Sequence, residues 1–296
     1  MKFLFAHRTL AILVGLLCIS IALWFVFKPL STLALFDDIW TLSHQTSAFG
    51  EHCTVQVRGI QDRSIPPTQN SRDVIGVLKE LSLDVVSHIQ RDGNKSYRLI
   101  QSSSPLGATD DNGAVALIKL EMIFDGTNEY VRYDTTGPWI AFPKKALADM
   151  SNFIQKMFED QFYFSLDDIT KETVSLKEVK KSIDNKEVLV FRGQQTEHSL
   201  DMAKQLFQYP IGIYTVREHH GDVIVDRSEK TVLKTMLYTL FEYSDVGDTS
   251  LAIDIPVYQE CEPVSEKDLD VFAPSDVLWA SKEEVQQYLL FKILPK

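Results

Sequence analysis

The sequence predicts an α+β fold in which apolar helices interrupt an antiparallel sheet and a transmembrane helix comes first. Three observations support this prediction. Residues Thr9–Phe27 form an apolar run without a charge. Beyond them, polar and apolar residues alternate with a period of two between turns such as Asp92-Gly93, which is typical of antiparallel hairpins. Lys144–Phe162 and Ser199–Gln208 instead place their apolar residues at helical spacing.

The run Thr9–Phe27 is expected to cross a membrane. As a helix with a rise of about 1.5 Å per residue it reaches roughly 28 Å, close to the hydrocarbon thickness of a bilayer. Lys2 and Arg8 precede the run, whereas Asp37 and Asp38 follow it. Because positive charge is retained on the cytoplasmic side, we expect a single-pass cell-membrane protein whose main domain is extracytoplasmic.

Two alternatives to an uncleaved anchor remain open. The first is a cleaved secretory signal, for which the nearest cleavage motif is the imperfect Thr32-Leu33-Ala34. The apolar run is longer than the roughly 7–15 residues of a signal core, which favours an anchor. The second is lipidation of Cys18, but Leu17 stands where a lipobox requires a small residue.

The remaining chain is expected to form one large domain. We predict a cytoplasmic N-terminus at 1–8, an anchor at 9–27, a main domain at 28–262 and a linker with a helix at 263–296. The expected helices are Leu30–Ala48, Lys144–Phe162, Ser199–Gln208 and a last one within Ser275–Leu294, opened by a capping box at Ser281–Glu284. The expected strands begin at Glu51 and include Val74–Gln90, Lys95–Ser103, Ala114–Phe124, Glu129–Tyr133, Trp139–Phe142, Thr173–Ser182, Lys186–Gln194, Gly212–His219, Val223–Asp226, Thr231–Tyr243 and Leu251–Pro256. Gln61–Arg72 is expected to be a loop, and His220–Asp222 a turn.

Acidic residues outnumber basic ones, with a formal net charge of −11. Without Lys2, Arg8 and Lys28, the exported part keeps 27 basic and 41 acidic residues. This balance argues against nucleic acid as a partner and leaves no basic patch for anionic lipid. We expect a solvated acidic surface.

Cys53 and Cys261 are the two cysteines outside the predicted span. Two cysteines in an oxidising compartment can pair, so we predict a disulfide between them. A metal site is the rival interpretation, but the C-x-x-C or H-x-x-x-H spacing of a zinc site is absent from the sequence.

Motifs for catalysis are absent from the sequence. It has no nucleophile elbow, P-loop, G-x-G-x-x-G or H-E-x-x-H. His219 and His220 are adjacent, so in a strand they point to opposite faces and do not share an ion. The acidic pairs at 37–38, 110–111 and 167–168 are explained by helix starts and loops. We therefore expect a protein that is not an enzyme and that has no cofactor or metal.

Three segments carry a family resemblance. Ile123–Asp134, followed by Trp139 and Pro143, is similar to a hairpin with the pattern apolar-apolar-Asp-Gly, aromatic strand, Trp, apolar, Pro. Ile183–Phe191 is similar to a Val-Asn-Gly turn with an aromatic strand, and Val223–Lys234 to a strand, turn and Lys element of the same family. On these segments, residues 35–256 resemble the outer-membrane lipoprotein carrier (LolA/LppX-like) superfamily.

The resemblance implies a curved antiparallel sheet, an incomplete β-barrel closed by inserted helices, around an apolar cavity. Members of the superfamily use the cavity for lipid acyl chains or a lipoprotein, or sense the state of the envelope. Here the expected cavity residues lie on the apolar faces of the two inserted helices: Phe153, Ile154, Met157, Phe158, Phe162 and Phe207. The expected function is binding of a lipid or a lipidated or otherwise hydrophobic partner. The alternative is a sensor or scaffold that binds a protein, with Ser275–Lys296 as the contact.

Overall fold

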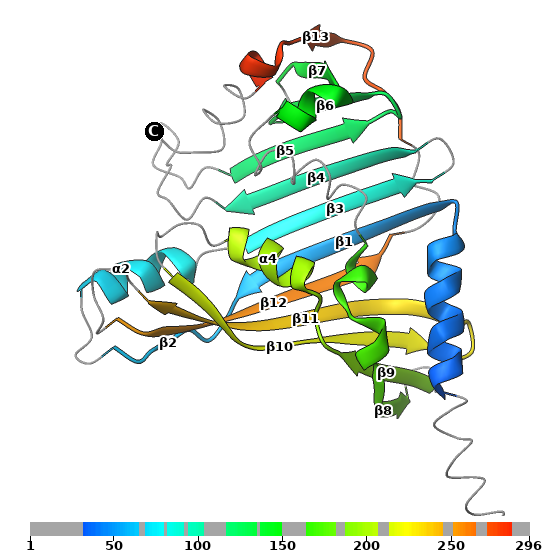
Figure 1. The fold of residues 1–296 in the computed structure, drawn as a ribbon, viewed down its shortest axis with the longest axis vertical. Helices are drawn as coiled ribbons and strands as arrows, with labels where there is room; N and C mark the ends of the chain where they lie inside the picture. Colours follow the sequence, from blue (N-terminus) through cyan, green and yellow to red (C-terminus); the bar gives the residue numbers. More distant parts are fainter. Residues whose placement is uncertain are drawn as a thin grey trace, which may run out of the picture.

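One open sheet of thirteen strands organises the protein (Figure 1). The computed structural model describes residues 32–64, 69–79, 82–91, 94–103, 117–134, 137–149, 164–181, 187–206, 213–244, 251–264 and 271–285. The strands follow the order β13-β7-β6-β5-β4-β3-β1-β12-β11-β10-β9-β8, and β2 pairs with β12 off this path. The sheet does not close on itself, since β13 and β8 end this path.

The strands are β1 (Ala48–Val57), β2 (Gln61–Asp62), β3 (Ser82–Gln90), β4 (Lys95–Ser103), β5 (Leu117–Phe124), β6 (Asn128–Tyr133), β7 (Trp139–Pro143), β8 (Ser175–Lys181), β9 (Glu187–Gly193), β10 (Ile213–Asp226), β11 (Thr231–Ser244), β12 (Ile253–Pro263) and β13 (Val277–Trp279). All pairings are antiparallel except that of β13 with β7. Helical segments are residues 32–45, α2 (Gln69–Leu78), η1 (Lys144–Asp149), η3 (Ser165–Asp168), η4 (Lys171–Thr173), α4 (Glu197–Leu206) and residues 282–285.

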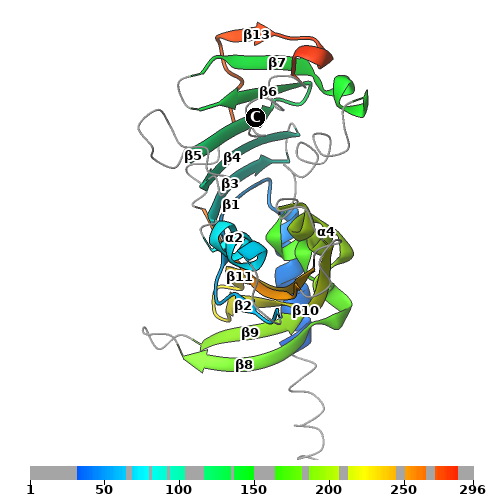
Figure 2. The same cartoon turned by 90° about the vertical axis from the view of Figure 1, so that its left-hand side faces the viewer.

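The sheet is strongly curved, and helices occupy its concave side (Figure 2). Alternation along the strands produces this face. In β11 the side chains at odd positions from Thr235 to Tyr243 are buried, whereas those at even positions are half-buried. Helix 32–45 contributes Phe36 and Ile39 to the buried cluster over β9–β11, and α2 contributes Leu78 to the cluster over β1, β11 and β12. The concave face is therefore the core-forming face of the sheet.

Several expected elements are confirmed. Helix 32–45 lies within the predicted Leu30–Ala48, and α4 within two residues of the predicted Ser199–Gln208. The capping box also forms, because the Ser281 N–H donates to Glu284 Oε2 at 2.7 Å and the Glu284 N–H to Ser281 Oγ at 3.3 Å.

Other expectations are wrong. Gln61–Arg72 is not a plain loop, since it contains β2 and the start of α2, whose β-branched residues and Gly76 obscured the helical pattern. The predicted turn at His220–Asp222 is absent, because β10 runs straight through it. Strand β12 continues past Pro256 and includes Cys261, and a short strand that was not expected, Val277–Trp279, precedes the expected last helix, of which residues 282–285 are helical.

The predicted span Thr9–Phe27 lies outside the described residues. Among the helices in the described ranges, none is long and apolar enough to cross a membrane.

Candidate functional site: the concave face of the sheet

The concave face carries apolar clusters at both of its ends. At one end, a buried cluster on β5, β6 and β7 includes Met122, Val131 and Phe142, and is covered by Leu147 of η1 and by Val285. At the other end, helix 32–45, η3 and α2 cover β9–β12. Between these two ends, the inward-facing Leu83, Val85 and Ile100 of β3 and β4 are only half-buried, whereas Ser87, Ile89 and Ser96 farther along the same face are buried.

We call this central region the concave patch and define it as Leu83, Val85 and Ile100, which share one face because Val85 is directly opposite Ile100. Leu83 packs on the cluster of β1 and β12, whereas Ile100 packs on that of β5–β7. The patch thus connects the two apolar clusters across the middle of the sheet.

Ile169 fixes the segment after η3 against the floor of the concave face. Gly193 of β9 and Gly221 of β10 are paired directly. A Cβ at Gly221 would lie 2.5 Å from Cγ1 of Ile169, and a Cβ at Gly193 would lie 2.7 Å from its Cγ2. The two glycines therefore leave the space that Ile169 fills, which explains why Gly221 lies in the middle of a strand.

A buried polar pair, Glu51 and Ser165, fixes the beginning of η3 on β1. The Ser165 hydroxyl donates to Glu51 Oε1 at 2.5 Å, and the Ser165 N–H donates to Oε2 at 3.0 Å. Glu51 is 4% exposed and Ser165 is 3% exposed. Two donors on one buried carboxylate hold η3 in a single position.

Burial raises the pKa of Glu51 to about 7. Loss of solvent is the largest cause, because it disfavours the ionised carboxylate. The two hydrogen bonds from Ser165 lower the pKa, the charge of Asp167 raises it and that of Arg98 lowers it. A carboxyl group inside the protein therefore changes its charge close to neutral pH.

A second polar contact joins η3 to helix 32–45. His44 Nε2 lies 2.6 Å from Oδ1 of Asp167, and His44 Nδ1 lies 2.7 Å from the carbonyl oxygen of Trp40. The rings of His44 and Trp40 stack with centroids 5.2 Å apart. Glu51, Ser165, Asp167 and His44, named here the polar cluster, thus connect the N-terminal helix, the central strand and η3.

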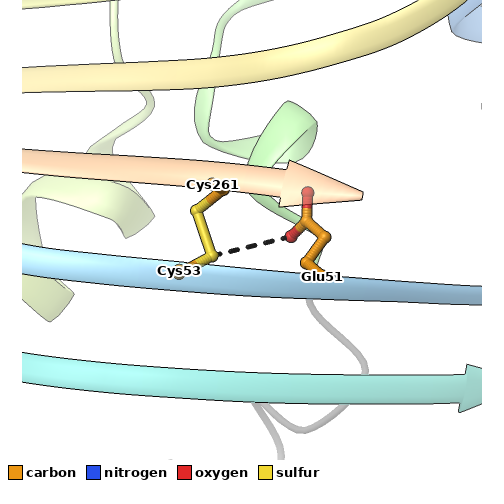
Figure 3. Close-up of side chains that lie close together, drawn as sticks. All are labelled: Glu51, Cys53 and Cys261. Carbon is orange, nitrogen blue, oxygen red and sulfur yellow. Dashed lines mark hydrogen bonds between the residues drawn. A yellow bond between two sulfur atoms is a disulfide. The ribbon is translucent and has the colours of Figure 1, made fainter. Parts of the chain in front are cut away.

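The predicted disulfide is present next to this cluster (Figure 3). Cys53 and Cys261 are directly opposite on β1 and β12, with their Cα atoms 4.0 Å apart. Oε2 of Glu51 lies 3.9 Å from Cys53 Sγ. The three side chains meet within 4.8 Å, a spacing that suits a metal ion. Cysteine binds zinc as a thiolate, however, and both sulfurs are used in the disulfide, so these residues do not fit a metal in this state.

The six predicted cavity residues lie outside the described residues. Five belong to the gap between η1 and η3, and Phe207 follows directly after α4. Both flanking elements, η1 and η3, pack on the concave face through Leu147 and Leu166.

His219 and His220 lie on opposite faces of β10 as expected, because His219 is opposite Thr239 and His220 is opposite Tyr238. The sequence analysis missed Glu51 and Ser165. Glu51 is the first residue of an alternating pattern, and its position on the apolar face of that pattern was the available signal.

The comparisons with known protein families and curated proteins found no match. No family model matches the sequence, and no curated protein matches it.

Proposed function

We propose that this is a membrane-tethered, extracytoplasmic binding protein without enzymatic activity, which holds a lipid or another hydrophobic ligand against the concave face of its sheet. The observation that carries the proposal is the half-buried concave patch between two fully buried apolar clusters. Concave, mostly apolar surfaces with a few polar groups are typical of ligand sites. Here the charged groups near the patch include Glu51 and Arg98, whose charges influence each other.

The membrane tether in this proposal is inferred from the sequence alone, from the predicted span Thr9–Phe27. Helix 32–45 starts a few residues after the predicted span and ends against η3 through His44 and Asp167. A domain attached so closely to a bilayer captures ligands from that bilayer and is not free to carry them elsewhere. This proposal depends on an uncleaved anchor.

Photo-cross-linking tests the ligand site. The full-length protein in lipid nanodiscs is incubated with a diazirine-labelled palmitic acid, irradiated and digested, and the labelled peptides are identified by mass spectrometry. We expect label on β3 and β4 in addition to the predicted span. Label confined to residues 9–27 would contradict the proposal.

Strand β4 offers a matched pair of variants. Leu99 and Ile100 are adjacent and both half-buried, but their side chains point to opposite faces. Ile100→Gln is expected to reduce labelling of β3 and β4 about two- to fivefold, because it places an amide on the apolar patch. Leu99→Gln is expected to leave labelling unchanged.

A second candidate function is binding of a protein partner near β13. Phe272, Leu278 and Trp279 are 72%, 57% and 62% exposed, which is unusual for large apolar side chains that are close together in sequence. A photoreactive benzoylphenylalanine at position 279 is expected to cross-link one discrete protein in native membranes, whereas the same residue at position 283 is not.

A further inference from the structure

The convex face of the sheet carries a row of three rings. His220, Tyr238 and Tyr258 are directly opposite one another on β10, β11 and β12. Their ring centroids are 5.1 Å and 5.2 Å apart. All three side chains are half-buried, so part of each ring contacts solvent. The row is a preformed aromatic platform on the face opposite the proposed lipid site.

A shallow depression of about 330 Å³ includes this platform. Besides the rings, its lining contains Met236 and four charged residues: Arg192, Glu218, Asp222 and Glu260. Two of the three carboxylates, Asp222 and Glu260, are paired with basic side chains, which leaves the charge of Glu218 unbalanced. The depression favours a ligand that is positively charged and that can lie on aromatic rings.

Glu218 is the carboxylate that the protein leaves available. Asp222 binds Arg192 and Lys177, with its oxygens 2.6 and 2.9 Å from their nitrogens. Glu260 lies 3.2 Å from Lys234. Within the described part of the chain, no lysine or arginine lies within ion-pair distance of Glu218, whose side chain is 59% exposed.

The nearest basic group to Glu218 is His220, with 3.8 Å between Oε1 and Nδ1. Loss of solvent is the largest cause that lowers the pKa of His220 below 6.5, and Arg192 lowers it further. His220 is therefore mainly neutral at pH 7 and does not balance the charge of Glu218.

The same face already shows what such a set of groups binds. On β6, the guanidinium of Arg132 lies 4.5 Å from the centre of the Trp139 ring, and its Nε donates to Glu121 Oε2 at 2.6 Å. An aromatic ring and a carboxylate on neighbouring strands thus hold one arginine. The platform and Glu218 offer the same combination, and the arginine that lines the depression, Arg192, is bound to Asp222 instead.

We propose that the convex depression is a docking site for an arginine side chain on a basic peptide segment of a partner protein. The planar guanidinium would lie on the rings of Tyr238 and Tyr258 while its N–H groups donate to Glu218. An open depression admits a side chain that arrives on an extended peptide. The net charge of −11 attracts a basic segment at longer range. This site is independent of the proposed lipid site.

Fluorescence anisotropy tests the proposal. The full-length protein in phosphatidylcholine nanodiscs is titrated into fluorescein-labelled hexa-arginine or hexa-lysine at about 0.15 M salt, a concentration that screens distant charges. Empty nanodiscs provide the background. Hexa-arginine is expected to bind more tightly than hexa-lysine, because an ammonium group does not stack on a ring as a plane.

Four variants distinguish binding at the convex depression from attraction of the peptide by the net charge of the protein. Glu218→Gln is expected to weaken hexa-arginine binding about fivefold or more, and Tyr238→Leu about two- to fivefold. Tyr238→Phe keeps the ring and is expected to bind nearly as the wild type. Glu172→Gln removes one exposed charge on η4 and is expected to change affinity less than about twofold.

Three results would overturn the proposal. One is binding no stronger than that of empty nanodiscs. The second is equal affinity for hexa-arginine and hexa-lysine. The third is an equal loss for Glu172→Gln and Glu218→Gln, which would show that net charge alone attracts the peptide. Glu218 is exposed, so its variant tests the site even where Tyr238→Leu fails to fold.

Discussion

The buried carboxyl of Glu51 should make the stability of the protein depend on pH near neutrality. The folded protein raises the pKa of this group from 4.5 to about 7. Between these values the folded state binds more protons than the unfolded state, so the free energy of unfolding falls as the pH rises. The difference between the two pKa values corresponds to about 3 kcal/mol. This stability is fully present below about pH 4.5 and is lost by about pH 7.

Glu51→Gln removes the titration while keeping the shape of the side chain. Its amide still accepts a hydrogen bond from Ser165, but its NH₂ group faces one of the two Ser165 donors, at a cost of about 1–3 kcal/mol. The unfolding free energy of the wild type minus that of the variant is therefore expected to fall by about 3 kcal/mol from about pH 4.5 to pH 8. Taking the difference removes the opposite pH effect of His220, whose pKa is lowered.

Denaturant unfolding of the full-length protein in detergent, followed by far-UV circular dichroism at several pH values, measures this difference. Ser165→Ala provides an independent check. The hydrogen bonds from Ser165 lower the pKa of Glu51, so loss of the hydroxyl should extend the pH-dependent loss of stability to higher pH. Glu172→Gln, on the exposed η4, should retain the wild-type profile. A difference between wild type and Glu51→Gln that is constant with pH would refute this reasoning.

Two further predictions concern the scaffold. Replacing both Cys53 and Cys261 by serine should destabilise the protein by at most about 5 kcal/mol in the chain-entropy model, given the 208-residue separation, and non-reducing electrophoresis should show slower migration. Unchanged stability would indicate that the pair is reduced in the isolated protein. Gly221→Ala should destabilise the protein by about 1–3 kcal/mol, because its Cβ would lie 2.5 Å from Ile169. Gly76→Ala in α2 should stabilise it by about 0.5–1 kcal/mol, because a Cβ there meets nothing within 4 Å. Thermal unfolding compares the two variants, and equal shifts in melting temperature would contradict the packing of Ile169.

Local patterns were enough to predict most strands and the helices at 32–45 and 197–206. Period-two alternation and turn residues are local signals, and they identified the hairpin of β3 and β4 and the meander of β5, β6 and β7. Pairing of Cys53 with Cys261 was also predictable, because few cysteines were available. These features depend on residues that are close in sequence or on simple counting.

The missed features depend on contacts between distant residues. Gly221 resembles a turn residue, but its role is to leave space for Ile169 from a separate segment. Glu51 looks like one polar residue among many until Ser165 approaches it from more than a hundred positions away. The row of His220, Tyr238 and Tyr258 exists only through the register of three strands. Such contacts leave no pattern in any one window of sequence.

The junction of β1 with β12 determines how the two halves of the sheet meet. Strands β3 to β7 follow β1 in the chain, and β8 to β11 precede β12, so two antiparallel units join at this one long pairing (Figure 1). The pairing links residues about two hundred positions apart, and such contacts form late and at a high entropy cost. The disulfide and the contact of Glu51 with Ser165 both lie at this junction. Reduction of the disulfide should therefore loosen the union of the two units, and with it the packing of Leu83 on the cluster of β1 and β12, before it disturbs either unit alone.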